Sequence, residues 1–227
     1  VELIPDVIHP AHNLYVRNVT VAQQNVVNIY FSVDAQADIF GLDLERSDDG
    51  INFTKISSIT VPPNFNAIQM TTDNTAQTDF RSYYYRITST DSCGNKASSS
   101  VAQTILLEGY SFTNEINALQ WNNYFLEHGT NLGYNIYRNP STSPVLITFS
   151  PMGNNSFQED VTTIVDQSGK LCYVVEAVDT TIFPNGIHDT VMSRSNELCL
   201  DQLVKLWMPN AFAPDGTNNI FKPVTLF

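Results

Sequence analysis

Histidine and cysteine are the residue types in this chain that most readily bind metals or carry redox chemistry, and both are scarce. The chain has three cysteines and four histidines, namely Cys93, Cys172, Cys199, His9, His12, His128 and His188. His9 and His12 are three residues apart, but this spacing alone is a weak metal signal. The HExxH, GxSxG, P-loop and dinucleotide-binding motifs are all absent. We therefore expect no enzymatic activity, no cofactor and no metal.

The acidic residues form no catalytic or calcium-binding pattern either. Asp48-Asp49-Gly50 resembles half of a calcium loop, but the Asp-x-Asp-x-Asp-Gly spacing of an EF-hand is missing. Asp-Gly between two alternating segments is a strong hairpin signal, so we predict a hairpin turn there. Glu159-Asp160 has no partner that the sequence would place as the second member of an acid–base pair.

Charge narrows the classes of partner. The 227 residues contain 23 acidic and 11 basic side chains, which give a net charge of −12. Phosphate binding depends on a basic surface, so we do not expect nucleic acid or an anionic membrane as a partner. No apolar run reaches the ~18 residues of a membrane-spanning helix. Val1 to Pro5 does not read as a signal peptide, and we expect the chain to be cut from a longer precursor.

The elements that would position these side chains are short strands. Val27, Ile29, Phe31 and Val33 alternate with polar residues, which predicts a half-buried strand. Similar alternating segments follow along the chain, with turn residues between them. Throughout, apolar residues recur with the strand period of 2 rather than the helical period of 3.6. The fold class we expect is all-β.

The second half of the chain repeats the first. Tyr134–Arg138 matches Leu42–Arg46, and Tyr173–Asp179 matches Tyr85–Asp91. The period is about ninety residues, close to the ~100 residues of an immunoglobulin-like sandwich. Two tandem sandwich domains therefore fit better than one large domain.

Each half resembles a fibronectin type III domain. That family carries a buried Trp on its second strand, which Trp121 matches and Phe31 replaces. Its sixth strand reads Tyr-x-Tyr-x-Val-x-Ala or a close variant. Tyr83, Tyr85, Ile87 and Ser89 fit in the first half, and Tyr173, Val175 and Ala177 fit in the second, where Leu171 replaces the first Tyr. The resemblance implies tandem immunoglobulin-like β-sandwiches with Trp121 and Phe31 in their cores.

The resemblance also predicts a disulfide between Cys172 and Cys199. The sixth and seventh strands of such a sandwich lie side by side, and one cysteine falls on each. Cys172 is out of phase with Tyr173 and Val175, so the bridge would lie on the solvent face. The alternative is a pair of free buried thiols in a cytosolic protein. An exported chain would favour the disulfide. Cys93 then remains as a free thiol or pairs with another part of the precursor.

The loop after the sixth strand of the second half is long, through Phe183 to His188, and long loops at sandwich ends often carry recognition. Asp179-Thr180-Thr181 and Asp189-Thr190-Val191 on either side of it resemble the short motif that Bacteroidetes bacteria O-glycosylate. Thr180 and Thr190 are therefore candidate O-glycosylation sites.

The C-terminal segment carries the most specific resemblance. It is similar to the opening of the gliding-motility-associated C-terminal domain, the type B sorting signal of the Bacteroidetes type IX secretion system. The matching order of residues is Pro209, Asn210, Ala211, Phe212, Pro214, Asp215, Gly216, Asn218, Asn219 and Phe221. The turn is two residues shorter than in the family, and Asn219 replaces the usual Asp. The resemblance implies export to the cell surface or the extracellular space, with the outer-membrane type IX translocon and its shuttle and attachment proteins as partners.

Together these patterns predict four parts. Residues 1–12 form a linker from an upstream domain, 13–108 and 109–205 form fibronectin type III-like domains 1 and 2, and 206–227 begin a C-terminal sorting domain. The leading hypothesis is a non-enzymatic, surface-displayed adhesin or gliding-motility protein whose sandwiches act as spacer or stalk. The alternatives are the spacer of a secreted polysaccharide- or protein-degrading enzyme and a glycan-binding module. Surface glycans or other adhesin components are further candidate partners.

Overall fold

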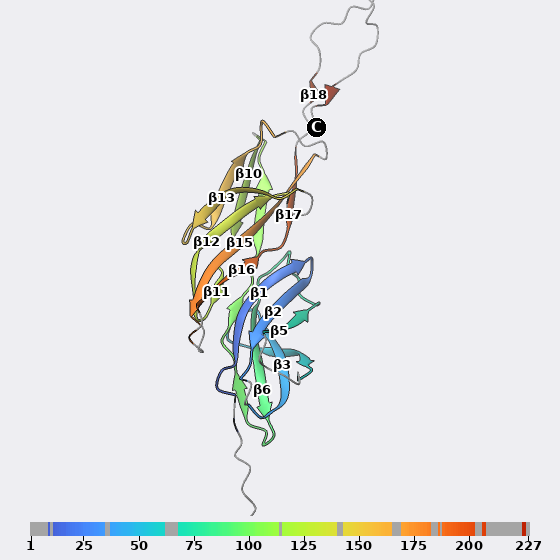
Figure 1. The fold of residues 1–227 in the computed structure, drawn as a ribbon. Coiled ribbons are helices and arrows are strands. Elements are labelled where there is room, and N and C mark those ends of the chain that lie inside the picture. Colours follow the sequence, from blue (N-terminus) through green and yellow to red (C-terminus); the bar gives the residue numbers. More distant parts are fainter. Residues whose placement is uncertain are drawn as a thin grey trace, which may run out of the picture.

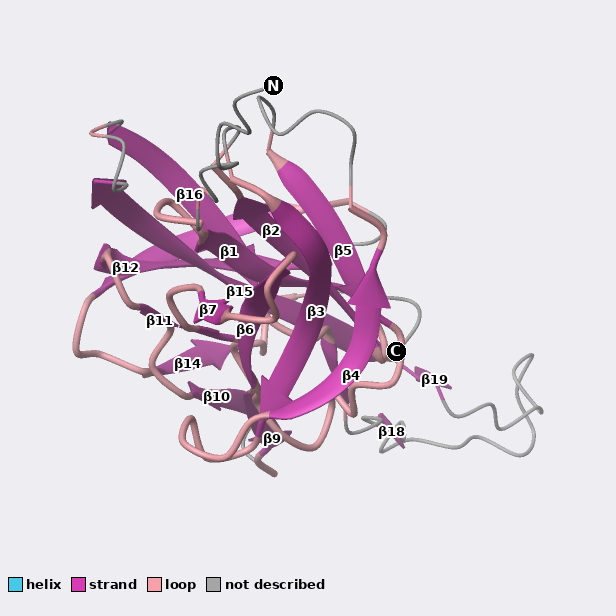
Figure 2. Cartoon of the chain, turned by 90° about the horizontal axis from the view of Figure 1, so that it is seen from below, coloured by secondary structure: helices cyan, strands magenta, loops and turns pink. Residues whose placement is uncertain are grey.

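The computed structural model describes residues 9, 11–34, 37–61, 68–113, 115–139, 143–164, 169–182, 186 and 188–202, together with the backbone of 206–207 and 224–225. Strands and connecting loops make up the whole described part of the chain, which contains no helix (Figure 2). All paired strands are antiparallel, in sheets that resemble tandem fibronectin type III or immunoglobulin-like sandwiches. The predicted all-β fold class is confirmed.

The first half of the chain contributes eight strands in two facing sheets. They are β1 (Tyr15–Gln23), β2 (Val26–Ser32), β3 (Ile39–Ser47), β4 (Thr54–Ile59), β5 (Gln69–Asp73), β6 (Tyr84–Asp91), β7 (Lys96–Ser98) and β8 (Ala102–Gln103). One sheet has the order β1-β2-β5, and the other contains β8-β6-β3-β4 with β7 also paired to β6. Figure 1 shows these strands in the lower half of the molecule.

The second half lies above the first and has the same layered plan (Figure 1). Its strands are β9 (Leu107–Ser111), β10 (Ile116–Trp121), β11 (Phe125–Leu126), β12 (Gly129–Arg138), β13 (Val145–Pro151), β14 (Ser156–Asp160), β15 (Lys170–Ile182), β16 (His188–Arg194) and β17 (Leu198–Asp201). One sheet has the order β14-β10-β9, and the other β13-β12-β15-β16 with β17 also paired to β15. Two further short strands, β18 (Leu206–Trp207) and β19 (Val224–Thr225), pair with each other.

Alternation along the strands explains the cores. Val27, Ile29 and Phe31 of β2 are fully buried, while the polar residues between them are half-buried. This is the expected result when one face of a strand packs on the core and the other faces solvent. Trp121 is also buried, so both residues predicted to mark the cores are confirmed as core residues. The ring of Trp121 meets the ring of Tyr134 edge-on, with 5.4 Å between their centroids.

The predicted hairpin at Asp48-Asp49-Gly50 joins the paired strands β3 and β4. Asp49 stabilises it, because its Oδ1 accepts hydrogen bonds from the backbone N–H groups of Ile51 and Asn52 at 2.8 and 2.7 Å. These two bonds hold the pKa of Asp49 well below its ordinary value, and the bond from Asn52 has the larger effect. Gly50 has φ +73°, a conformation that glycine adopts without strain.

The first half contains a hydrogen bond of the tyrosine-corner type. The hydroxyl of Tyr83 accepts a bond of 3.2 Å from the backbone N–H of Gln77, six residues upstream. The second half has the buried Leu171 in the corresponding place, which cannot make this bond.

Two of the predicted domain limits need adjustment. The limit between residues 108 and 109 falls inside β9, all five residues of which pair with β10, so the strand of the second sandwich begins at Leu107. The backbone of His9, in the predicted linker, bonds Asp38 twice: its carbonyl accepts the Asp38 N–H, and its N–H donates to Asp38 Oδ2, both at 2.8 Å. The first sandwich therefore holds part of the segment that the sequence suggested was a linker.

Candidate functional site

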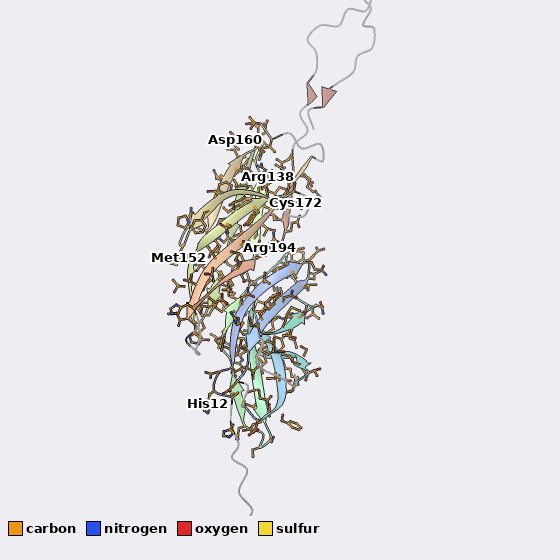
Figure 3. All side chains as sticks on the ribbon, in the orientation of Figure 1. His12, Arg138, Met152, Asp160, Cys172 and Arg194 are labelled. Atoms are coloured by element: carbon orange, nitrogen blue, oxygen red, sulfur yellow. A yellow bond between two sulfur atoms is a disulfide. The ribbon has the colours of Figure 1, made fainter. Side chains whose placement is uncertain are left out.

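The predicted disulfide is present. Cys172 on β15 and Cys199 on β17 lie directly opposite each other, with 3.9 Å between their Cα atoms, and their sulfur atoms are bonded. Cys172 is half-buried and Cys199 is exposed, which confirms that the bridge lies toward solvent. Figure 3 labels Cys172 in the upper sandwich. The carboxylate of Glu197 lies close to both sulfur atoms, but a metal would require thiolates, and the disulfide leaves none there.

Cys93 is a free, exposed thiol in the turn between β6 and β7. Asp91 builds this turn, because its Oδ1 accepts the N–H groups of Cys93 and Asn95 at 2.9 and 2.8 Å. Gly94 has φ +85°, which suits glycine. The geometry accounts for the Ser92-Cys93-Gly94-Asn95 turn without a ligand.

A surface pocket of about 650 Å³ lies at one end of the second sandwich, where the long β15–β16 connection begins. Its lining includes both candidate O-glycosylation residues, Thr180 and Thr190, and the imidazoles of His128 and His188. Thr180 and Thr190 are directly opposite on β15 and β16, with Thr190 exposed and Thr180 half-buried. The structure thus brings the two threonines together, while their modification stays a prediction.

A buried carboxylate lies beside this pocket. Asp179 is 1% exposed, and its Oδ1 accepts a hydrogen bond of 3.0 Å from the backbone N–H of Thr130. Burial raises the pKa of Asp179 to about 6, although the bond from Thr130 partly opposes the shift. A Cβ at Gly129 would lie 2.3 Å from the same Oδ1 atom, so only glycine fits against this carboxylate.

The two sandwiches meet at a junction formed by segments that are distant in the sequence. β1 of the first sandwich runs beside β16 of the second. Side-chain hydrogen bonds join them, from Asn18 Nδ2 to the Met192 carbonyl at 2.7 Å and from the Arg194 N–H to Thr20 Oγ1 at 2.9 Å. The Ser193 hydroxyl donates to the Val19 carbonyl, and Arg17 forms an ion pair with Asp189. Figure 3 labels Arg194 at this level of the molecule.

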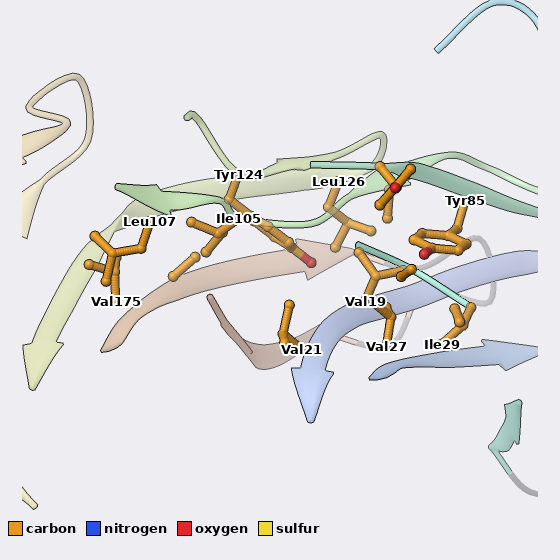
Figure 4. Close-up of a cluster of buried hydrophobic side chains, with 14 of the residues drawn as sticks. Val19, Val21, Val27, Ile29, Tyr85, Ile105, Leu107, Tyr124, Leu126 and Val175 are labelled. Carbon is orange, nitrogen blue, oxygen red and sulfur yellow. The ribbon is translucent and has the colours of Figure 1, made fainter. Parts of the chain in front are cut away.

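Apolar side chains fill the same junction. The hydrophobic core is one continuous cluster that includes residues of both sandwiches. In Figure 4, Val19 and Val21 of β1 lie near the side chain of Tyr124, and Leu107 lies beside Val175. Tyr124, between β10 and β11, is 5% exposed. The two cores are therefore joined by buried apolar contacts rather than separated by solvent.

The connection between the sandwiches is held by two asparagine side chains. Asn196 Oδ1 accepts the N–H of Leu107 at 2.7 Å, and its Nδ2 donates to the Leu107 carbonyl at 3.0 Å. Asn122 likewise accepts the N–H of Leu106 at 2.6 Å and donates to the Thr104 carbonyl at 3.0 Å. In addition, β11 of the second half pairs with β8 and so extends a sheet of the first. These bonds and this strand pairing tie the connecting backbone to both sandwiches.

Sequence reasoning did not find these junction residues. The bonded partners are 89 residues apart in the case of Asn196 and Leu107, and 174 apart in the case of Asn18 and Met192. The neighbouring sequence does not distinguish an asparagine that bonds a distant backbone group from one that faces water.

The residues predicted to match a sorting signal all lie outside the described residues, namely Pro209, Asn210, Ala211, Phe212, Pro214, Asp215, Gly216, Asn218, Asn219 and Phe221. The strands β18 and β19, which pair with each other, lie on either side of this segment. Within the described residues no helix is long and apolar enough to cross a membrane.

No protein-family model matches the chain, and a comparison with curated proteins finds no match. Among solved structures, the chain is similar to the FN1–FN3 domains of chicken CNTN1, with a TM-score of 0.28 and 10% sequence identity. This similarity covers 85% of the present chain and 70% of the chicken chain.

Proposed function

We propose that this chain is a non-enzymatic spacer in a secreted surface protein, and that its C-terminal segment directs export by the type IX secretion system. The observation that carries the spacer role is the junction between the sandwiches. It combines a continuous apolar core, side-chain bonds between β1 and β16, and a connection held by Asn122 and Asn196.

Such a junction suits a spacer because it fixes the orientation of one sandwich relative to the other. Interfaces between domains of one chain are usually polar, and relative motion is expected unless the interface is large and hydrophobic. Here the buried Val19 and Tyr124 would have to be exposed to water before the sandwiches could bend apart. The two sandwiches would then act as one rod that keeps a neighbouring domain at a constant distance from the cell surface.

Two features support the extracellular setting. The Cys172–Cys199 disulfide is typical of an oxidising compartment. The match of Pro209–Phe221 to the opening of the gliding-motility-associated C-terminal domain supports the type IX translocon and its attachment proteins as partners. We propose that the precursor is a cell-surface adhesin or a gliding-motility protein.

Export is tested with the full precursor in a Bacteroidetes host. Surface exposure is measured by protease accessibility on intact cells, in a strain with a working translocon and in one without it. We expect surface exposure only in the first strain, and periplasmic retention when Asn210→Ala and Phe212→Ala are combined. Phe80→Ala, at a residue that is 78% exposed, is the matched control and should be displayed normally. Equal surface exposure in both strains and in the motif variant would contradict the sorting role.

The spacer role is tested on the same chain by pulsed electron paramagnetic resonance. Spin labels are placed at Ile51 and Met152, which are 80% and 64% exposed and lie on different sandwiches, in a Cys93→Ser background. We expect one narrow distance distribution, and a broader one when Tyr124→Ala is added. A broad distribution in the unaltered junction would contradict a rigid spacer even if export were normal.

A further inference from the structure

A row of three outward-facing side chains crosses the junction on one sheet. Tyr84 of β6, Gln103 of β8 and Phe125 of β11 are directly opposite one another on successive strands. Directly opposed residues of antiparallel strands point to the same face. The residues next to them, Tyr85, Ala102 and Leu126, form a parallel row that is buried in the core. The first row therefore faces away from the core, and Phe125 is 44% exposed.

All three side chains line one pocket of about 710 Å³. The hairpin of Asp49 and Gly50 borders it on one side, and Asn123 and Glu127 from the second half border it on the other. No lysine, arginine or histidine is among the lining residues that the structure describes. Both sandwiches contribute, so the pocket exists only when the junction is formed.

The length of this row of side chains suits an extended ligand made of several rings. Neighbouring strands are ~4.8 Å apart, which places Tyr84 and Phe125 roughly 10 Å from each other with the amide of Gln103 between them. Two aromatic side chains at the ends and a hydrogen-bonding group in the middle could each contact a different ring of a chain-like molecule.

We propose that this pocket binds a neutral glycan chain. Pyranose rings carry C–H groups on their faces, which pack on aromatic side chains such as Tyr84 and Phe125, and hydroxyl groups at their rims. Amides both donate and accept hydrogen bonds, so Gln103 and Asn123 suit those hydroxyls. Carboxylates accept only, and a hydroxyl can donate to the Glu127 oxygen that does not accept the Val101 N–H. Binding sites commonly combine an apolar surface with a few such polar groups.

The charges of the pocket argue against the other ligand classes. Two carboxylates, with no base among the described residues that line the pocket, would repel phosphates and acidic glycans. A cationic peptide would gain little, because both carboxylates are already hydrogen-bonded to the backbone. Glu127 Oε2 accepts the N–H of Val101 at 2.7 Å, and Asp49 accepts those of its own turn. Ion pairs at such exposed carboxylates contribute little to binding.

The pocket is ordered before a ligand arrives. A Cβ at Gly50 would lie 3.3 Å from three ring atoms of Tyr84, so the glycine backbone supports that ring. Gln103 Nε2 donates to Ser82 Oγ at 3.0 Å, which orients the amide. Side chains that are already held lose less conformational entropy on binding. This site would give the spacer a contact with surface polysaccharide, a role beyond holding a distance.

The test is calorimetric titration of the full chain with neutral hexasaccharides of several types, namely cellohexaose, xylohexaose, mannohexaose, laminarihexaose and chitohexaose. We expect at least one to bind, and Phe125→Ala and Tyr84→Ala each to weaken that binding about tenfold. Tyr110→Ala, at a residue that is 55% exposed on the opposite sheet of the second sandwich, is the matched control and should bind as the unaltered chain does.

The outcomes are decisive. Melting temperatures within a few degrees of the unaltered chain show that a variant is folded, and chemical-shift changes confined to residues around Gln103 on titration would place the ligand independently of any variant. If none of the five sugars binds, or if Tyr84→Ala and Phe125→Ala leave the affinity unchanged, the proposal is wrong. Binding of an oligolysine peptide instead would also overturn it, in favour of a cationic partner.

Discussion

Arg46 and Tyr85 lie directly opposite each other on β3 and β6, and both bond the same oxygen atom of a third side chain. That atom is Asp73 Oδ2, at 2.8 Å from Arg46 Nη1 and 2.9 Å from the Tyr85 hydroxyl. Asp73 is 3% exposed. Burial by itself would raise the pKa of Asp73, but hydrogen bonds from Thr75, Tyr85 and Arg46 outweigh it and lower the pKa. The carboxylate therefore stays charged inside the sandwich.

The second sandwich repeats this arrangement. Arg138 and Tyr173 are opposite each other on β12 and β15, and both bond Glu159, the Tyr173 hydroxyl at 2.7 Å. Asn117 Nδ2 donates to the same hydroxyl at 2.8 Å. An arginine at the end of one strand and a tyrosine on the next thus enclose a buried acid in both halves. The Arg and Tyr that recur in both halves of the sequence therefore have the same structural role, because each pair bonds one buried carboxylate.

Removal of either acid should destabilise its sandwich strongly. Asp73→Ala leaves the Arg46 charge and the Tyr85 hydroxyl without their partner, and breaking such a pair costs about 3–5 kcal/mol. We expect the same for Glu159→Ala, measured as the free energy of unfolding in urea. Asp48→Ala breaks the exposed ion pair with Arg81 and should cost less than about 1 kcal/mol. Equal losses in the buried and exposed variants would contradict the role of the cluster.

The disulfide should stabilise the second sandwich. Cys172 and Cys199 are 27 residues apart, and closing a loop of this size contributes about 3 kcal/mol in the chain-entropy account. We expect the double variant Cys172→Ser and Cys199→Ser to lose this amount, and a reductant to lower the Tm of the unaltered chain but not that of the variant. Cys93→Ser should leave both measurements unchanged, because Cys93 is an exposed free thiol. A reductant effect that required Cys93 would contradict this assignment.

Tyr124 should couple the unfolding of the two halves. It is buried at the junction, and its backbone N–H donates to the Tyr134 hydroxyl at 3.0 Å. Truncation of a buried aromatic residue costs about 3–5 kcal/mol. We expect Tyr124→Ala to lower stability by this amount and to split one calorimetric transition into two. Tyr110→Ala removes the same atoms from an exposed position and should keep a single transition. Two transitions in the unaltered chain would show that the junction does not couple the halves.

The residues that the sequence placed correctly are those whose signal is local. The alternation of Val27, Ile29 and Phe31 follows from burying one face of a strand, and the turn at Asp49-Gly50 follows from side-chain bonds within four residues. The Cys172–Cys199 pair was predictable because adjacent strands bring them together in a known type of sandwich. By contrast, the junction depends on Asn196 bonding Leu107 across 89 residues. The row of Tyr84, Gln103 and Phe125 depends on strand register across that junction, which no pattern within a single strand contains.

The buried Asp179 gives the stability a pH dependence of definite sign. Its pKa is about 6 in the folded chain against an ordinary value of 3.8, with burial as the main cause. Between these two pH values the folded chain holds a proton that the unfolded chain has lost, so the free energy of unfolding falls as pH rises from about 4 to about 6. Asp179→Asn keeps an acceptor for the Thr130 N–H and removes the charge. We expect this variant to lack that fall, and at pH 7 to exceed the unaltered chain by on the order of 2 kcal/mol.

Asp160→Asn is the matched control for this prediction, and its effect should have the opposite sign. Hydrogen bonds from the Thr162 side chain and backbone lower the pKa of the exposed Asp160, so its charge adds stability above the ordinary pKa that is lost as pH falls. Urea unfolding of the three proteins from pH 3 to pH 8 separates the two effects. His128 and His188, which line the pocket next to Thr180, are present in all three proteins. If the profiles of the unaltered chain and Asp179→Asn run parallel throughout, the carboxylate of Asp179 titrates like one in water, and the buried charge beside the candidate glycosylation residues does not affect folding.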